Sequence, residues 1–438
     1  MNALTRFFAR ERAIAPVGYA RWRVPPAALA IHLSIGQAYA FSVFNLPLTK
    51  LIGVTESAPG DWALTTVGWI FSLAIVCLGL SAFAFGRWLE RVGPRLAMFA
   101  AACCFAGGLL VAALGVRTHQ IVLLYLGYGV LGGIGLGLGY ISPVSTLMKW
   151  FPDRPGMATG LAIMGFGGGA LIGSPLAMAL MARYATPTST GVEETFIAMA
   201  GIYFVVMLFG ALTVRLPGAP IPAAATTRPA AADMDVRDAV RTRTFWLLWA
   251  VLCLNVTAGI GVLGQASPMI QEMFPGRVDA ADAAAFVMLL SVANMLGRVL
   301  WSSLSDRIGR PRTYAIFFAL GAGLYAAVPT IGRSGDLRLF VAAYAVIMSM
   351  YGGGFATIPA YLRDHFGVAQ VGAIHGRLLT AWSLAGVAGP VAVNYLRQSQ
   401  IAHGVPKAEA YSVTMYLMAA LLVLGFLANA RIRAVPRR

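Results

Sequence analysis

Long apolar runs are the feature that most constrains this chain. About 20 apolar residues span the hydrocarbon core of a bilayer as a helix, and runs of this length recur along the whole sequence. We expect twelve helices, at approximately 25–49, 62–85, 96–115, 120–148, 156–182, 194–214, 245–272, 283–303, 314–332, 338–362, 372–396 and 409–430. Of the 438 residues, 58% are hydrophobic and only 11% are charged, whereas a soluble domain carries about a quarter charged residues. The sequence therefore predicts an all-α, multi-pass membrane protein without a large soluble domain.

The charge of the chain is strongly positive, at +16. The basic residues lie in clusters between the apolar runs, where Lys and Arg set the orientation of a membrane protein, so we expect no nucleic-acid partner. The basic N-terminal segment precedes a full-length apolar run and has no small-residue cleavage site, which is typical of a cytoplasmic tail and not of a cleaved signal peptide. We predict a bacterial-type inner-membrane protein with both termini in the cytoplasm.

The longest connection between apolar runs divides them six and six. It is rich in Pro and Ala and then charged, which is typical of a flexible linker. Identical residues recur at an offset of 216, including the pairs Arg91/Arg307 and Pro143/Pro359. We therefore predict two related, pseudo-symmetric six-helix halves. The expected organisation is an N-terminal tail, the first half, the linker, the second half and a C-terminal tail, at 1–24, 25–215, 216–244, 245–430 and 431–438.

Two equivalent loops carry the same acidic-Arg-x-Gly pattern: GRWLERVGPR at 86–95 and SSLSDRIGRPR at 302–312. Such groups can lock helix ends through charge-assisted hydrogen bonds. The pattern resembles the loop signature of the major facilitator superfamily, Gly-x-x-x-Asp-Arg-x-Gly-Arg-Arg. The first copy departs from it at Glu90 and Pro94, and the second has Ser302 in place of the leading Gly. The candidate gating residues are Gly86, Glu90, Arg91, Gly93, Asp306, Arg307, Gly309 and Arg310.

Longer stretches resemble one family within that superfamily. GQAYAFSVFNLPL, GLGLGYISPVSTLMKWFPDRPGMATG, NMLGRVLWSSLSDRIGR and YGGGFATIPAYLRDHFG are similar to the oxalate:formate antiporter family of organic-anion carriers and, more distantly, to the monocarboxylate porters. The resemblance implies the twelve-helix major facilitator fold and alternating access of a central anion site between the halves. It leaves the substrate open.

Arg298 is the basic residue that stands apart from the helix ends. All 17 acidic residues fall in predicted loops or at helix ends, whereas Arg298 lies eight residues before Asp306, about 12 Å inward along helix 8. A guanidinium at this depth is costly and is typical of a functional site. We expect it to bind a substrate carboxylate in bidentate fashion; the alternative is a side chain that reaches back to the membrane surface. The offset partner is Ala82, so the predicted site is charged from the second half.

Asn294 precedes Arg298 by one helical turn and shares its face. It either binds the anion and orients the guanidinium, or makes a contact between helices. In the monocarboxylate porters the corresponding position is typically Asp. The amide here removes a titrating group and weakens the case for proton symport by that route.

Further candidates are aromatic and polar residues of the apolar runs. Tyr140 and Tyr351 lie beside Gly-rich stretches and are candidate hydroxyl donors, with Tyr39 and Gln37 as weaker candidates; packing or an interfacial position is the alternative for each. The resemblance to oxalate carriers implies a Lys in helix 11, but alignment of GRLLTAWSLAGVAGP places Trp382 or a neighbour there. One buried cation matches one negative charge and therefore favours a monocarboxylate.

Other chemistry is not indicated. The Gly-rich strings lie inside predicted helices and follow no strand, which argues against a dinucleotide site. The four cysteines lie in apolar runs without metal-ligand spacing, and His32 and His375 are either proton acceptors or interfacial residues. We expect no cofactor, no metal and no enzymatic activity, because no nucleophile, base or metal cluster lies at depth.

The predicted function is therefore secondary active or facilitated transport of a small organic anion across the bilayer. A monocarboxylate of the lactate, pyruvate or formate type is favoured, moved by alternating access with a single buried arginine. Exchange or uniport is favoured, and we expect the protein to be a monomer. The alternatives are oxalate/formate antiport, proton-coupled monocarboxylate symport, and export of an unrelated small molecule by a facilitator.

Overall fold

The computed structural model describes residues 7–219, 221, 233–263 and 265–433. Within these residues, the only non-helical pairings are isolated bridges, Ile14 with Leu216 and Thr186 with Ser189. Twelve helices in the described part of the chain are long and apolar enough to cross a membrane, which confirms the predicted fold class. These spans are Arg21–Leu48, Leu64–Val92, Pro94–Arg117, Ile121–Trp150, Pro155–Tyr184, Val192–Thr213, Arg243–Gly261, Asp282–Ile308, Arg310–Ser334, Leu337–Phe366, Val371–Ala402 and Ser412–Ala430.

Contacts divide the chain into two compact units. The first comprises 1–153, 161–227 and 370–380, and the second comprises 154–160, 228–369 and 381–438. The predicted ends of the two halves, at 215 and 245, stay a prediction.

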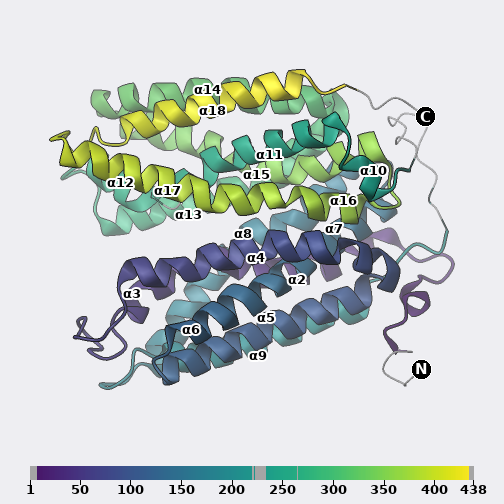
Figure 1. Ribbon diagram of the computed structural model, residues 1–438, viewed down its shortest axis with the longest axis horizontal. Coiled ribbons are helices and arrows are strands. Elements are labelled where there is room, and N and C mark those ends of the chain that lie inside the picture. Colours follow the sequence, from purple (N-terminus) through teal and green to yellow (C-terminus); the bar gives the residue numbers. More distant parts are fainter. Residues whose placement is uncertain (1–6, 220, 222–232, 264, 434–438) are drawn as a thin grey trace. The chain divides into compact units, whose positions relative to one another are not determined.

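The first unit contains the helices that begin the chain and one short helix from far along it (Figure 1). Its elements are η1 Arg10–Ala13, η2 Arg21–Arg23, α2 Pro25–Ile35, η3 Gly36–Phe44, α3 Asn45–Leu48, α4 Leu64–Val92, α5 Pro94–Arg117, α6 Ile121–Leu124, η4 Tyr125–Gly132, α7 Gly133–Trp150, α9 Val192–Thr213, α16 Val371–Leu378 and most of α8 Pro155–Tyr184. Helix α5 packs on α9 and α7, and α4 packs on α7 and α16.

The second unit contains the remaining helices and the first turns of α8. Its elements are α10 Val236–Ala239, α11 Arg243–Leu263, α12 Ala266–Met273, α13 Ala280–Ile308, α14 Arg310–Ser334, α15 Leu337–Phe366, α17 Thr380–Ala402 and α18 Ser412–Ala430. Helix α13 packs on α15, and α14 packs on α18, the neighbouring pair at the top of Figure 1.

Several predicted helices are interrupted. The single helix expected at 245–272 is wrong, because α11 ends at Leu263 and α12 begins at Ala266. The helix expected at 372–396 is likewise divided into α16 and α17, with Leu379 between them. The first span changes from α to 3-10 geometry at Gly36, where an added Cβ would lie 2.6 Å from Phe166 O. Residues without a side chain at such points let two backbones approach closely.

The two motif segments are not loops, contrary to the prediction. Helix α4 continues through Val92 and α13 through Ile308, so that single glycines, Gly93 and Gly309, separate them from α5 and α14. These glycines have φ values of 86° and 90°, a conformation that other residues rarely adopt. Arg298 consequently lies eleven residues, about 16 Å, from the turn at Gly309, and is deeper than the sequence suggested.

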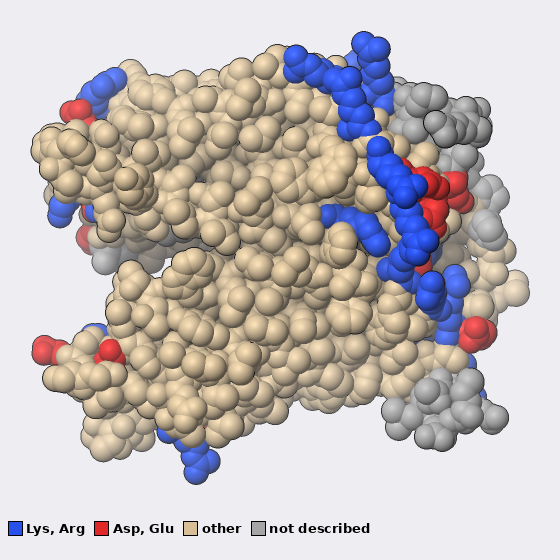
Figure 2. Space-filling view, viewed as in Figure 1, with Lys and Arg blue, Asp and Glu red and all other residues tan. Residues whose placement is uncertain are grey.

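The surface of the spanning helices is apolar. Large side chains such as Val205 and Leu300 are each 66% exposed, as expected for residues that contact lipid. On the face shown in Figure 2, the blue Lys and Arg side chains lie in clusters, and large tan areas between them carry few charges.

The tight contact between α13 and α15 depends on Gly297. A Cβ at this position would lie 2.6 Å from Ser349 Cα, whereas a Cβ at Gly323, also within a helix, would meet nothing within 4 Å. We predict that Gly297→Ala lowers the free energy of unfolding by about 1–3 kcal/mol, because the clash forces the helices apart. Gly323→Ala, the matched control, should be neutral or stabilising. Thermal unfolding of the purified protein in detergent measures both, and equal behaviour of the two variants would contradict the close packing.

Candidate functional site

Arg298 is fully buried in the second unit, on α13. Its Nε donates a hydrogen bond to Oδ1 of Asn294 at 3.2 Å, so the predicted pairing of these residues on one helix face is observed. Asn294 is itself buried, with 2% of its surface exposed. The neighbouring helix α15 can pass close by because Gly352 has no side chain: a Cβ there would lie 2.5 Å from Asn294 Oδ1.

An aromatic wall adjoins the guanidinium. Arg298 Cζ lies 5.5 Å from the ring centroid of Phe355 on α15, a cation–π distance. The Phe355 ring contacts Trp382 of α17 at 4.6 Å and Tyr351 at 5.3 Å between centroids. Four residues of the predicted site therefore lie together in the second unit: Asn294, Arg298, Tyr351 and Trp382. Phe355 was missed, although its position one turn after Tyr351 placed it on the same face.

A further polar residue of the second unit escaped the sequence reasoning. Asn255 on α11 lines a small cavity together with Gly259, Tyr325 and Tyr351. Its Oδ1 is buried and has no hydrogen-bond partner in the structure. The available signal was a lone amide in the middle of an apolar run, because buried polar groups in membranes are costly and are often functional.

In the first unit, Tyr140 is fully buried among other rings. Its ring centroid lies 5.4 Å from His32, 5.5 Å from Phe166 and 5.8 Å from His375. Both histidines are buried, and neither ring nitrogen of His375 has a hydrogen-bond partner. This cluster offers an imidazole in apolar surroundings, which the sequence left as an open alternative.

Tyr39 and Gln37 take different places in the first unit. Tyr39 is half-buried and packs edge-on against Phe166 at 4.9 Å. Gln37 is fully buried and accepts a hydrogen bond from the Tyr128 hydroxyl at 3.0 Å. The observed hydrogen-bond partner of Gln37 is therefore Tyr128 of η4, not a member of the Tyr140 cluster.

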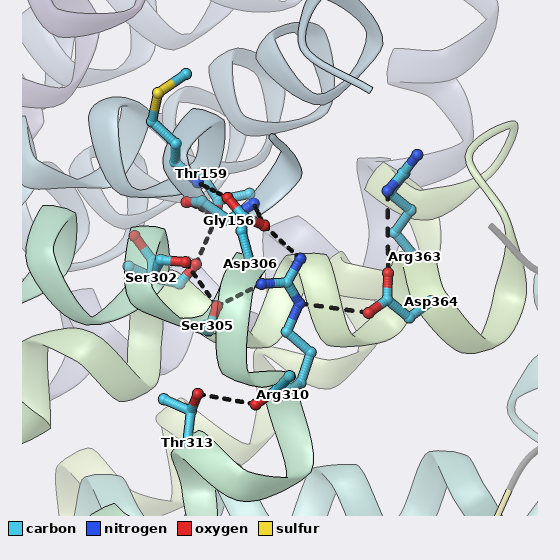
Figure 3. Close-up of polar contacts among 12 residues, drawn as sticks. Gly156, Thr159, Ser302, Ser305, Asp306, Arg310, Thr313, Arg363 and Asp364 are labelled. Atoms are coloured by element: carbon cyan, nitrogen blue, oxygen red, sulfur yellow. Dashed lines mark hydrogen bonds and ion pairs between the residues drawn. The ribbon is translucent and has the colours of Figure 1, made fainter. Parts of the chain in front are cut away.

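Asp306 is the centre of a cluster at the end of α13. Figure 3 shows its carboxylate between Arg310 and the N-terminus of α8. It accepts backbone hydrogen bonds from Gly156 and Met157, both at 2.9 Å, and it forms an ion pair with Arg310 at 2.6 Å. Arg310 also reaches Asp364 at 3.3 Å. A carboxylate at a helix N-terminus is stabilised by the free N–H groups and by the helix dipole, so this cluster ties the ends of α8, α13, α14 and α15 together.

The equivalent Glu90 has a different partner. It forms an ion pair with Lys149 of α7 at 2.7 Å, within the first unit. Gly86 packs against α16, where a Cβ would lie 2.8 Å from Ala373 Cα. Arg91 and Arg307 are exposed and belong to none of the ion pairs in the described part of the chain.

A separate cluster lies near the opposite ends of helices in the second unit. Arg397 of α17 binds Glu272 of α12 through two nitrogens, and the Tyr411 hydroxyl donates to Glu272 Oε2 at 2.9 Å. Burial, together with the hydrogen bond to the Glu272 carboxylate, raises the pKa of Tyr411 above its ordinary value. No group of three or more His, Cys, Asp or Glu that could hold a metal occurs among the residues the structure describes.

The described part of the chain has twelve apolar spans, a buried guanidinium next to aromatic rings, and ion-paired clusters at helix ends. These features are typical of a multi-pass membrane transporter. The chain matches the model of the Major Facilitator Superfamily over residues 26–390 and 277–438, and it belongs to that superfamily.

Individual relatives agree with the predicted resemblance. The chain is 27% identical over 369 residues to the oxalate:formate antiporter of Oxalobacter formigenes, covering 83% of this chain and 81% of that protein. It is also 27% identical over 401 residues to mouse monocarboxylate transporter 11, covering 87% and 82%. The solved structure of the Escherichia coli fucose:proton symporter matches with a TM-score of 0.66 at 14% identity, covering 94% of this chain and 100% of that one, and supports the fold alone.

The Asp306 cluster generates a prediction about stability. Asp306→Ala removes the acceptor of two backbone N–H groups and one of the two carboxylate partners of the buried Arg310, so we expect the free energy of unfolding to fall by about 3 kcal/mol. Asp238→Ala is the matched control, because its pair with Arg241 spans 3.9 Å between side chains that are 66% and 81% exposed. Thermal unfolding in detergent compares them. A decrease no larger than that of the control would show that the cluster does not stabilise the protein.

Proposed function

We propose that this superfamily member is a secondary transporter of small organic anions, most favourably monocarboxylates of the lactate, pyruvate or formate type. It acts by alternating access, by exchange or uniport, as a monomer in a bacterial-type inner membrane with both termini in the cytoplasm. It has no enzymatic activity in this proposal. Arg298 binds the carboxylate, and Asn294 orients the guanidinium.

The single observation that carries the proposal is the burial of Arg298 ten residues from the end of α13. All acidic residues of the chain lie outside the helices or within the first or last turn of one. The acid nearest along α13, Asp306, is already bound to Arg310 and to the N-terminus of α8. A positive charge at this depth favours an anion as ligand, and the planar guanidinium fits a carboxylate.

The surroundings of Arg298 favour a small ligand with one negative charge. Phe355 and Trp382 present apolar ring surfaces, and α17 supplies no lysine beside them. A dianion such as oxalate would leave one charge to be balanced by neutral groups. The relatives named as an oxalate:formate antiporter and a monocarboxylate transporter support the anion class, and oxalate/formate antiport is the first alternative.

Tyr351, Tyr140, Tyr39, Gln37 and Trp382 are proposed as further substrate contacts. Tyr351 and Trp382 have the stronger support, because both touch the Phe355 ring that adjoins Arg298. Tyr140 and Tyr39 both contact Phe166 in the first unit. Gln37 has the weakest support, since its carbonyl already binds Tyr128.

Proton symport is the second candidate mechanism, and His375 is the observation that favours it. Its imidazole is buried with both nitrogens available, and the titratable groups on the helices packed against α16 include Tyr140, Glu90 and Lys149. Against symport, the residue bonded to Arg298 is an amide, which does not titrate.

The test is exchange of labelled lactate, pyruvate, formate and oxalate by the protein in proteoliposomes. We expect at least one monocarboxylate to exchange, and Arg298→Gln to reduce its exchange by more than 100-fold at equal reconstitution, because a neutral amide cannot replace the bidentate charge. Arg312→Gln, which removes an exposed arginine close by in sequence, should exchange as the wild type does.

Two results would overturn the proposal. If the wild type moves none of these anions, the chain is a facilitator of another small molecule. If Arg298→Gln retains full exchange, the arginine is structural. Imposed pH gradients distinguish the mechanisms: net uptake driven by the gradient, and lost in His375→Gln, would favour symport over exchange.

The Asn294–Arg298 pair yields a second prediction. Asn294→Asp keeps the shape of the side chain but places a carboxylate 3.2 Å from Arg298 Nε. This internal anion competes with the substrate, so we expect exchange at neutral pH to fall at least tenfold while the thermal unfolding midpoint rises. Asn294→Ser, which adds no charge, is the control and should lose less activity. Unchanged exchange in Asn294→Asp would mean that the substrate does not use the Arg298 charge.

A further inference from the structure

Another buried arginine lies at the start of a spanning helix in the first unit. Arg95 is the second residue of α5, and only 6% of its surface is exposed. Its Nη1 donates to Phe7 O at 3.4 Å, and its Cζ lies 5.7 Å from the Phe7 ring centroid. The Nε is buried and has no hydrogen-bond partner in the structure. Arg95 is therefore a charge held at the surface level of the membrane with its bonding capacity unfilled.

The charged groups that act on Arg95 are also positive. They are Arg12 and Arg215, which backbone pairing brings together: Leu216 N donates to Ala13 O at 2.7 Å, and Ala15 N donates to Leu216 O at 2.8 Å. All 17 acidic residues are among those the structure describes, and no ion pair there includes any of these three arginines.

The positive charges around Arg95 favour the binding of an anion. The exposed carboxylate of Glu11 is the one acid in the adjoining segment η1. The free N–H groups at the N-terminus of the 24-residue helix α5 add further positive potential beside Arg95. By contrast, the buried Arg310 has two carboxylates on it. Burial of a guanidinium among like charges is unfavourable unless a ligand neutralises it.

The segment beside the arginines has the character of a lipid-contacting surface. Phe7, Ile14 and Trp22 are 43%, 46% and 55% exposed, although they lie outside or at the edge of the spanning helices. Phe8 anchors the segment by stacking on Phe99 of α5 with 4.5 Å between centroids. Exposed apolar side chains interleaved with arginines are typical of a chain lying in the headgroup region.

We propose that Arg12, Arg95 and Arg215 bind the phosphate of an anionic phospholipid. The phosphodiester oxygens accept hydrogen bonds from the guanidinium groups, with Arg95 Nε as one donor, while Phe7 and Ile14 contact the acyl chains. The lipid neutralises the cluster and fastens the N-terminal segment to α5 and to the chain after α9. Free inorganic phosphate has the same oxygen chemistry, but the exposed apolar residues favour the lipid.

The test is binding to the full-length protein in detergent, read by native mass spectrometry and by the thermal unfolding midpoint, and it does not depend on transport. The probes are short-chain phosphatidylglycerol, short-chain phosphatidylcholine and inorganic phosphate. We expect retention of phosphatidylglycerol and a rise of the midpoint, with little effect of the other two. Arg12→Gln and Arg215→Gln should each weaken phosphatidylglycerol binding about fivefold, and Arg95→Gln by more.

Arg117→Gln is the matched control, because it removes an exposed arginine from the opposite end of the same helix. It should bind phosphatidylglycerol as the wild type does. Arg12 is exposed, so its variant tests the site even where Arg95→Gln does not fold. The proposal is overturned if phosphatidylcholine or inorganic phosphate binds as well as phosphatidylglycerol, or if Arg12→Gln and Arg215→Gln retain wild-type binding. If phosphatidylglycerol binds as expected but the protein transports no carboxylate, only the proposed function is contradicted.

Discussion

The cost of placing a charge inside a bilayer decides where this chain puts its ionisable residues. Every acidic side chain lies outside the helices or within one turn of a helix end, where water or a helix terminus can stabilise it. The resulting carboxylates then serve as connectors: Asp306 joins α8 to α13 and α14, and Glu272 joins α12 to α17. Arg298 is the departure from this rule, and the candidate site is built around it.

The sequence predicted the fold because the signal for a spanning helix is long and strong. It predicted the Arg298–Asn294 contact because a separation of four residues places two side chains on one helix face. The sequence did not predict the positions at which two of the helices are interrupted. Apolar composition is similar on both sides of Leu379, so hydropathy carries no information on that break. After Leu263 the residues of α12 are more polar than those of α11, a signal that the prediction did not use. The motif segments were misplaced for a related reason, since one glycine with positive φ suffices for the turn and charged residues continue the helix up to it.

Contacts between residues distant in sequence were beyond the same reasoning. Phe355, Trp382 and Arg298 come from three helices, and only the packing of α15 through Gly352 shows that their side chains meet. The repeat at offset 216 was informative about position but not about partners. Asp306 has Arg310 beside it, whereas the residue equivalent to Arg310 in the first copy is Pro94, and Glu90 instead binds Lys149. The equivalent acids Glu90 and Asp306 thus connect different helices, so the two copies of the motif have diverged in their ion-pair partners.

Three of the four arginines that are buried in the described part of the chain illustrate how surroundings determine what a cation can do. Arg310 lies between Asp306 and Asp364, so its charge is neutralised within the protein and it acts as a structural tie. Arg298 donates to the Asn294 amide and lies against the Phe355 ring, groups that orient a guanidinium, and in the proposed function it binds the carboxylate of the substrate. Arg95 has arginines as its charged neighbours, an arrangement that the phosphate of the proposed lipid would neutralise. Burial alone does not distinguish these roles; the charge and the hydrogen-bonding capacity of the nearest side chains do.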